Sequence, residues 1–436
     1  MDRGVDVRVG MGTETARRPQ EGEDVELAGV EETSAGEASA AIRTWQLAAG
    51  VTALYLGIRA LGLLLLNTMI HHGGTTRYVN TPGLVEALRN WDAVFYLRLA
   101  DYGYDNPQMS APYGGPSIRS VAFLPGYPAM VHVAAGLTHL STMNAALLVT
   151  GVAGVVAACS LFFLVRGLHG DRVALITVVL WAAHPASIVL SSAYSEALFC
   201  ALAFSALLAV YRQRWLLAGL LAFGAGLVRA QGLALGGGLV LYAAWTWWRG
   251  RGGEATAGAE GNTPGAVGRA RSLRMLAGSV LALLGTPTYM VVIGIHVGNI
   301  WTWFDQQRLG WQSEWTWGSE TRRQAWYEFS GDDHFFALTC MILLVAAVVL
   351  LVCAAEQREW SALLLVGVLI AVETLGSSVI MQSKPRLLVP AVVVFLPIAR
   401  ALASARPVSR WLVLSCLALF GLWLGDYSVT VWKYGI

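Results

Sequence analysis

The chain has 436 residues, of which 56% are hydrophobic and only 13% charged, and its mean hydropathy is +0.54. Soluble domains carry about 25% charged residues and cannot cover so much apolar surface, so the composition excludes an ordinary soluble protein. The net charge is +2, and no basic stripe interleaved with aromatic residues is present, so we expect no nucleic-acid partner. The composition therefore predicts an integral membrane protein.

The first part of the chain differs sharply from the rest. Residues 1–43 are rich in Glu, Asp, Gly, Ala and Arg and lack an apolar period, which predicts a disordered cytoplasmic tail. Residues 44–436 contain repeated apolar runs close to the ~20 residues that a membrane-spanning helix needs. We predict an all-α, polytopic membrane protein of about 11 transmembrane helices, at 45–70, 144–166, 172–190, 195–211, 215–229, 231–248, 275–297, 335–355, 361–381, 387–403 and 410–431.

An additional apolar stretch, residues 121–140, is interrupted early by Pro125 and Pro128. If this stretch does not cross the membrane, the arginine-bearing loops all fall on the side of the N-terminal tail, as the positive-inside rule requires. We therefore expect a helix on the outer membrane surface. The segments 71–143 and 298–334 are then outward-facing loops of a multi-pass protein, and the Gly- and Ala-rich composition favours a bacterial plasma membrane.

The first outward loop contains an acidic residue, Asp92, among the aromatic residues Trp91, Phe95 and Tyr96. A carboxylate that is partly desolvated near the membrane surface can act as a general base or hold sugar hydroxyls. Asp is also a favoured N-cap, so Asp92 is equally suited to begin a helix at Ala93. The two interpretations are compatible, because a capping Asp is also held in place.

The order of motifs in this loop resembles that of the PIG-V-type mannosyltransferases of the GT-C superfamily. The resemblance covers about residues 45–240, and the segments that carry it are Trp91-Asp92, Ala100-Asp101-Tyr102-Gly103-Tyr104, Ala122-Phe123-Leu124-Pro125-Gly126-Tyr127-Pro128, Ala193-Tyr194-Ser195-Glu196-Ala197-Leu198-Phe199 and Gly226-Leu227-Val228-Arg229-Ala230-Gln231-Gly232-Leu233. Beyond residue 240 it rests mainly on hydropathy and on the basic turn Lys384-Pro385-Arg386-Leu387-Leu388.

This resemblance implies an enzyme with GT-C-like outer loops that transfers a hexose, usually mannose, from a polyprenyl-phosphate or dolichyl-phosphate carrier. Asp92 matches the position of the acid that the family is expected to use in catalysis. The substrate would be polyprenyl-phosphate-mannose within the membrane lipid, and the acceptor a glycan, a lipid or a protein. The remaining residues that we expect to bind substrate are Trp91, Tyr96, Asp101, Tyr127, Glu196, Arg229, Gln231, Lys384 and Arg386.

Three of these residues are cations at predicted outer ends of spans: Arg229, Lys384 and Arg386. Such cations can neutralise a departing lipid phosphate, although interfacial basic residues also snorkel without any specific ligand. Glu196 is either a functional acid near the membrane or a helix-start acid that complements the dipole. Glu373 lies within an apolar run, where we expect a basic neighbour that the sequence does not identify.

Other features of the outer segments have simpler explanations. His71 and His72 are adjacent and have no third ligand at an evident spacing, so we expect solvated residues and predict no metal site, although a need for a divalent metal is left open. The second outer segment is dense in tryptophan, which is typical of the membrane interface and also suits stacking on a sugar.

Two other classes of membrane protein remain as alternatives. A transporter or flippase of lipid-linked sugars would share the spans and the interfacial cations, but it should place ionisable groups near mid-membrane in broken helices. A scaffolding protein would explain the spans but not the long acid-bearing first loop. The sequence therefore favours a membrane glycosyltransferase.

Overall fold

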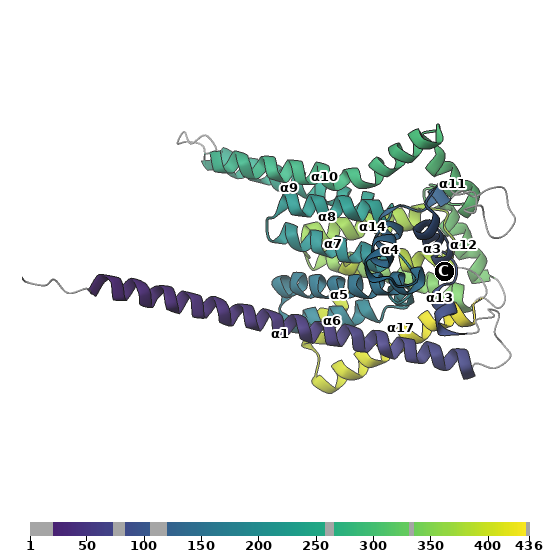
Figure 1. The fold of residues 1–436 in the computed structure, drawn as a ribbon, viewed down its shortest axis with the longest axis horizontal. Coiled ribbons are helices and arrows are strands. Elements are labelled where there is room, and N and C mark those ends of the chain that lie inside the picture. The colour runs from purple at the N-terminus through teal and green to yellow at the C-terminus, as the bar shows by residue number, and fades with distance from the viewer. Residues whose placement is uncertain (1–20, 73–82, 105–119, 258–265, 331–334, 433–436) are drawn as a thin grey trace, which may run out of the picture. The chain divides into compact units, whose positions relative to one another are not determined.

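The computed structural model describes residues 21–72, 83–104, 120–257, 266–330 and 335–432. Residues 1–50 and 51–436 form two separate units, and the second holds nearly all of the fold (Figure 1). In the described ranges the only β-type pairing is an isolated bridge between Trp315 and Ser377, so the all-α prediction is confirmed.

The described helices follow one another along the chain in this order. The α-helices are α1 (Glu21–His72), α2 (Leu84–Leu88), α3 (Ala93–Tyr102), α4 (Gly126–Thr138), α5 (Thr142–His169), α6 (Asp171–Ala182), α7 (Glu196–Tyr211), α8 (Trp215–Val228), α9 (Gly232–Ala257), α10 (Ala266–Val297), α11 (Thr302–Trp311), α12 (Ser319–Ser330), α13 (Phe335–Glu356), α14 (Ser361–Gly376), α15 (Lys384–Leu387), α16 (Leu396–Ser404) and α17 (Pro407–Thr430). Short 3₁₀ turns are η2 (Ser120–Ala122), η3 (Ser187–Leu190), η4 (Met381–Ser383) and η5 (Val392–Phe395).

Several of these helices are suited to a bilayer by length and composition. Among the described residues five are long and apolar enough to cross it, namely Ile42–His72, Thr142–His169, Arg271–Val297, Phe335–Glu356 and Pro407–Thr430. Three shorter apolar helices, α7, α8 and α14, coincide with other predicted spans. The protein is therefore a multi-pass membrane protein, while the number of eleven spans stays a prediction.

Two predicted spans are not continuous helices, and proline explains both breaks. In the predicted span 172–190, α6 ends at Ala182 and η3 follows after Pro185. The predicted span 387–403 is the second half of a bent pair, Met381–Leu387 and Val392–Ser404, whose axes differ by 87°. Pro390 lies in the bend, where it supplies no backbone N–H for helix continuation.

The predicted tail also differs in part, because α1 begins at Glu21 rather than near residue 44. Residues 21–43 are rich in Glu and Ala, which are good helix formers, and they join directly to an apolar helix that supplies the nucleus. Residues 1–20 lie outside the described ranges.

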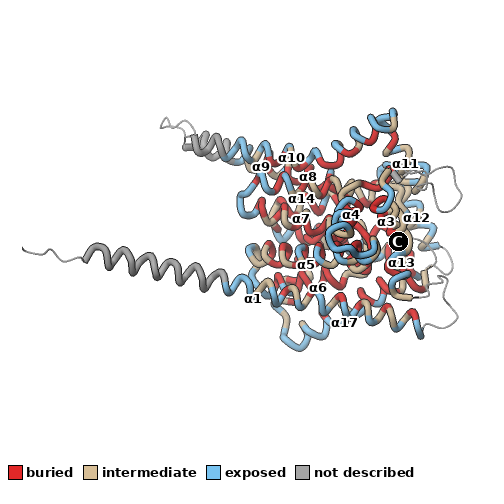
Figure 2. The backbone as a smooth tube through the Cα atoms, in the orientation of Figure 1, coloured by how far each residue is buried: buried red, intermediate tan, exposed pale blue. Residues whose placement is uncertain are grey.

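The predicted surface helix of residues 121–140 is present as α4. Its 13 residues span about 20 Å, too short for about 30 Å of hydrocarbon. Figure 2 shows α4 nearly end-on, whereas α5 to α8 run across the picture, so α4 lies across the direction of the bundle. The outer segments 71–143 and 298–334 contribute α3, α11 and α12 to one end of the bundle (Figure 1).

Close packing of α8 against α10 depends on glycine. A Cβ added to Gly285 would lie 2.1 Å from the carbonyl oxygen of Phe223, and one added to Gly226 would lie 2.8 Å from the backbone nitrogen of Thr286. The hydroxyl of Thr286 donates to the carbonyl of Gly226 at 2.8 Å. The backbones can approach only without side chains, as in other membrane helix pairs, and the contact fixes the end of α8 just before Arg229.

We predict that Gly285→Ala forces α8 and α10 apart and destabilises the protein by about 1–3 kcal/mol, the usual cost of overpacking. The matched control is Gly224→Ala on α8, whose added Cβ would meet Leu202 at an ordinary 3.6 Å. The melting temperature in detergent should fall for Gly285→Ala and stay near the wild-type value for Gly224→Ala. Equal melting temperatures for the two variants would contradict this account of the helix contact.

Candidate active site

A cavity of about 420 Å³ opens among α3, α8, α11, α14 and the 379–387 segment. This volume lies within the 300–1,000 Å³ typical of small-molecule sites. Its wall combines apolar and aromatic surface with a few charged groups. The lining residues that matter for chemistry are Trp91, Asp92, Tyr96, Arg229, Gln231, Trp303, Trp311, Glu373 and Arg386. The cavity therefore brings together predicted site residues from the region before residue 240 and from the basic turn that contains Arg386.

Asp92 stands at the start of α3, and its side chain is free for another partner. It occupies the N-cap position but makes no side-chain capping hydrogen bond. Trp91 before it has a positive φ of 61°, which turns the chain sharply into the helix. The Asp92 carboxylate instead accepts a hydrogen bond from the Arg386 guanidinium, with Oδ2 2.6 Å from Nη2. Of the two interpretations, the structure favours a positioned acid.

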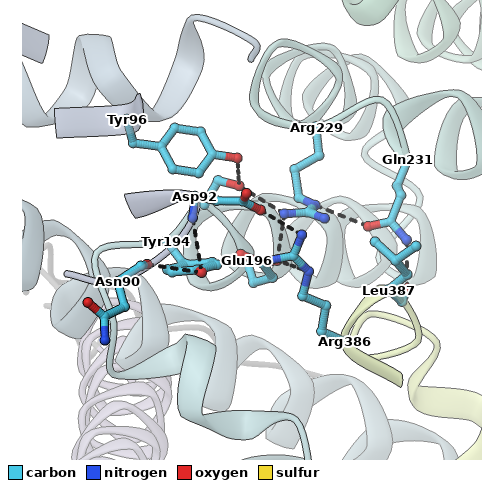
Figure 3. Close-up of polar contacts among 10 residues, drawn as sticks. Asn90, Asp92, Tyr96, Tyr194, Glu196, Arg229, Gln231, Arg386 and Leu387 are labelled. Atoms are coloured by element: carbon cyan, nitrogen blue, oxygen red, sulfur yellow. Dashed lines mark hydrogen bonds and ion pairs between the residues drawn. The ribbon is translucent and has the colours of Figure 1, made fainter. Parts of the chain in front are cut away.

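Glu196 is fully buried and sits between two arginines (Figure 3). Its Oε1 lies 2.7 Å from Nη1 of Arg229 and 3.8 Å from Nε of Arg386. With Asp92 these residues form a cluster of two carboxylates and two guanidiniums, which we call the charge cluster. Its net formal charge is zero, and this balance offsets the cost of burying Glu196 and most of the other three side chains, which are 12–19% exposed.

Each arginine of the charge cluster is held by further contacts. Arg229 donates from Nε to Oε1 of Gln231 at 3.2 Å and from Nη1 to Oγ of Ser195 at 3.0 Å. Gln231 in turn donates to the carbonyl of Leu387 at 2.6 Å, which ties the α8–α9 turn to α15. The guanidinium carbon of Arg386 lies 5.5 Å from the ring centre of Tyr194. The arginines are thus positioned before any ligand arrives.

Lys384 has a different place from the predicted phosphate ligand. It is fully buried, and its Nζ donates to the carbonyls of Thr374 and Ser377, each at 2.8 Å. The ammonium therefore satisfies carbonyl groups at the end of α14 and does not line the cavity. It positions α15, and with it Arg386, instead of meeting a ligand directly.

Tyr96 links α3 to the loop before α7. Its hydroxyl is hydrogen-bonded to that of Ser195 at 2.7 Å, and its ring packs edge-on to Phe123 and Tyr127. Burial raises the pKa of Tyr96 to about 12, so this hydroxyl stays protonated near neutral pH and cannot act as the base.

Two other predicted substrate ligands lie away from the cavity. Tyr127 is fully buried, and its hydroxyl is hydrogen-bonded to Thr150 at 2.9 Å, so it joins α4 to α5. Asp101 is exposed at the far end of α3 and accepts a hydrogen bond from Thr142. Neither lines the cavity.

The tryptophans of the second outer segment divide into two groups. Trp303 and Trp311 line the cavity, where Trp303 donates to the carbonyl of Ala122 at 3.2 Å. Trp317 and Trp326 are 86% and 70% exposed, as expected of interfacial residues. Trp303 and Trp311 are thus placed where stacking on a sugar is possible, and that role stays a prediction.

Sequence reasoning assigned no place in the site to three residues that contribute to it: Ser195, Tyr194 and Glu373. Ser195 bonds both Tyr96 and Arg229, and Tyr194 donates to the carbonyl of Asn90 at 3.2 Å. The adjacent Glu196 was the only signal for the first two. Glu373 was noticed as an acid in an apolar run, but only the fold shows that it lines the cavity.

We predict that Glu196→Gln destabilises the protein by about 3–5 kcal/mol, because it leaves two buried arginines with one carboxylate. The control is Glu320→Gln on α12, whose partner Arg323 is 79% exposed, so that solvent screens the ion pair and its loss should change stability little. Thermal unfolding in detergent should separate the two variants clearly. Similar melting temperatures would show that the charge cluster does not hold the fold together.

Comparison with known proteins agrees with the motifs of the first outer loop. The family model described as Mannosyltransferase (PIG-V) matches residues 68–244. The GPI alpha-1,6-mannosyltransferase 2 of Mus musculus is 34% identical over 163 residues, and that of Homo sapiens is 31% identical over 166 residues. Each match covers 35% of this chain and 30% of the relative, so the chain matches less than a third of the length of these curated relatives.

Among solved structures, ArnT from Cupriavidus metallidurans in the apo state is similar, with a TM-score of 0.49 and 16% identity over 84% of this chain and 62% of that one. The matched family region contains Asp92, Tyr96, Glu196, Arg229 and Gln231. The resemblance to PIG-V-type mannosyltransferases is confirmed by the family model, which matches residues 68–244.

Proposed function

We propose that this protein is a membrane glycosyltransferase that moves a mannosyl group from polyprenyl-phosphate-mannose to an acceptor hydroxyl. The observation that carries the proposal is the pairing of the Asp92 carboxylate with the Arg386 guanidinium in a cavity that Arg229 also lines. A base beside two cations suits a reaction in which a hydroxyl loses a proton and a phosphate departs. The relatives' names supply the choice of mannose.

In this reaction the acceptor oxygen attacks the anomeric carbon of the donor sugar. The bond from that carbon to the phosphate oxygen breaks, and the acceptor's proton passes to Asp92. Arg386 and Arg229 stabilise the departing polyprenyl phosphate, since guanidinium groups can hold a phosphate through two parallel donors. Direct displacement of this kind inverts the anomeric configuration.

The ion pair between Asp92 and Arg386 also sets an order of events. The charge cluster is neutral as it stands, so an incoming donor phosphate has to compete with Asp92 for Arg386. Binding of the phosphate to Arg386 releases the carboxylate, which is then free to accept a proton from the acceptor. The base is thus exposed only when the donor is in place.

The orientation in the membrane follows from the loops. We propose a multi-pass protein of the plasma membrane with a cytoplasmic N-terminus, so that the end of the bundle with α3, α11 and α12 faces outward. The acceptor, a glycan, lipid or protein, then approaches from the outer aqueous side, while the donor's chain stays in the bilayer. A flippase for lipid-linked sugars is the alternative, and it would move such lipids across vesicles without forming a new glycosidic bond.

We predict that Asp92→Asn lowers mannose transfer from polyprenyl-phosphate-mannose by roughly 10²–10⁴-fold, because the base is removed while the shape is kept. The matched control is Asp101→Asn on the same helix, whose exposed carboxylate lies outside the cavity and whose loss should change transfer little. The assay uses purified protein in nanodiscs at matched amounts. Transfer that survives in Asp92→Asn would assign the base elsewhere.

The competition for Arg386 gives a separate prediction. Asp92→Asn should bind polyprenyl phosphate about tenfold more tightly than the wild type, because the competing carboxylate is gone. Arg386→Gln should bind it more weakly. Titration of polyprenyl phosphate into each variant in nanodiscs checks both, and an unchanged affinity in Asp92→Asn would refute the competition while leaving the transfer reaction standing.

A further inference from the structure

The cavity wall contains buried polar atoms that the protein itself does not satisfy. Four such atoms have no hydrogen-bond partner among the described residues: Nε1 of Trp91, Oε2 of Glu373, and Nε and Nη1 of Arg386. Leaving a buried donor or acceptor unpaired is costly, and native structures contain few of them. The residues that hold these atoms all line one cavity, so a ligand bound there is placed to supply the missing hydrogen bonds.

Several other polar groups of the wall are already engaged. Gln307 donates to the carbonyl of Ala122 at 3.0 Å, and Thr374 donates to Ile370 at 2.8 Å within its own helix. Gln231 and Arg229 are bonded to the protein as described above. The unpaired set is therefore specific: a cationic donor at Arg386, a neutral donor at Trp91 and a single acidic acceptor at Glu373.

We propose that Glu373 accepts a hydrogen bond from a hydroxyl of the donor sugar and contributes to selecting that sugar; this rests on the proposed function. A sugar phosphate matches the unpaired set group by group. Its phosphate suits the free donors of Arg386, and its hydroxyls suit the acceptor at Glu373 and the donor at Trp91. A carboxylate repels a phosphate, so Glu373 is suited to bind the sugar of the donor and not its phosphate.

The surroundings of Glu373 fit this role. It belongs to α14, a helix of otherwise apolar composition, and the nearby wall consists of residues such as Val228, Val379 and Ile380. Placing an acidic side chain in apolar surroundings costs free energy, and such residues usually have a function. The described residues contain no group of three or more His, Cys, Asp or Glu side chains able to hold a metal ion. A hydroxyl of a bound ligand would supply the hydrogen bond that Oε2 of Glu373 lacks.

Trp303 and Trp311 complete the case for a sugar. Both line the same cavity, and the ring of Trp311 packs edge-on to Phe123 with the ring centres 5.1 Å apart. Aromatic faces pack against the C–H surfaces of a pyranose, while carboxylates and indole N–H groups select its hydroxyls. The wall thus offers both kinds of surface that a hexose presents.

The experiment measures kcat/KM for polyprenyl-phosphate-mannose and for its 2-, 3-, 4- and 6-deoxy analogues, with the wild type, Glu373→Ala and Glu373→Gln. For one of the deoxy analogues, the kcat/KM of the wild type should be roughly ten- to hundredfold lower than for polyprenyl-phosphate-mannose, which is the value of a hydrogen bond to a charged group. Glu373→Ala should use that analogue and polyprenyl-phosphate-mannose with the same kcat/KM. Val372→Ala, also on α14 but 49% exposed and outside the cavity lining, should keep the wild-type pattern. Glu373→Gln preserves the shape should the alanine variant fail to fold.

Binding of polyprenyl phosphate, which carries no sugar, distinguishes failure of the role proposed for Glu373 from failure of the proposed function. Its affinity should be the same in Glu373→Gln and the wild type, because the phosphate is held elsewhere. Suppose that the wild type transfers mannose, but that the loss of kcat/KM caused by the Glu373 substitution adds to the loss caused by the missing hydroxyl for every deoxy analogue. Glu373 then does not bind the donor sugar, and the proposed function stands. If the wild type neither transfers mannose nor binds polyprenyl phosphate, the proposed function fails and this inference with it.

Discussion

The mutual neutralisation of Asp92, Glu196, Arg229 and Arg386 is the interaction on which the end of the bundle that carries the cavity depends. Each charge comes from a different part of the chain, and each would be prohibitively costly to bury alone. Glu196 has no exposure to solvent and touches both arginines. The loops that follow the spans are therefore fixed relative to one another by electrostatics, over a bundle packed by apolar side chains.

The part of this arrangement that sequence could predict is the part set by local chemistry. Asp92 in an aromatic loop, and Arg229 and Arg386 at span ends, were recognisable because charges near hydrocarbon are rare. Lys384, two residues from Arg386, looked equivalent in sequence. It differs because α14 ends beside it with unpaired carbonyls, and Lys384 satisfies two of them. Only the fold reveals which cation faces the helix end and which faces the cavity.

The same reasoning explains the differences in the fold. Apolar runs predicted the positions of the helices well, but the length of an apolar run does not show whether the helix is interrupted within it. Pro185 and Pro390 interrupt two of them, and the chain continues in 3₁₀ turns; the first leads to Ser195 and Glu196, and the second follows Arg386. Glu373 and Trp311 are distant in sequence from Asp92, so their place in one cavity depends on long-range packing that no local pattern records.

Charge balance also constrains how the proposed reaction could end. The donor is a phosphodiester with one negative charge, whereas the released polyprenyl phosphate is a monoester with about −1.5 to −2 near pH 7. The product would therefore hold Arg386 more tightly than the donor does. Asp92 is neutral just after it accepts the proton, so it cannot reclaim Arg386 until it loses that proton. Loss of the proton from Asp92 would then restore the ion pair and favour release of the lipid, which makes the residue that starts the reaction also the one that resets the site.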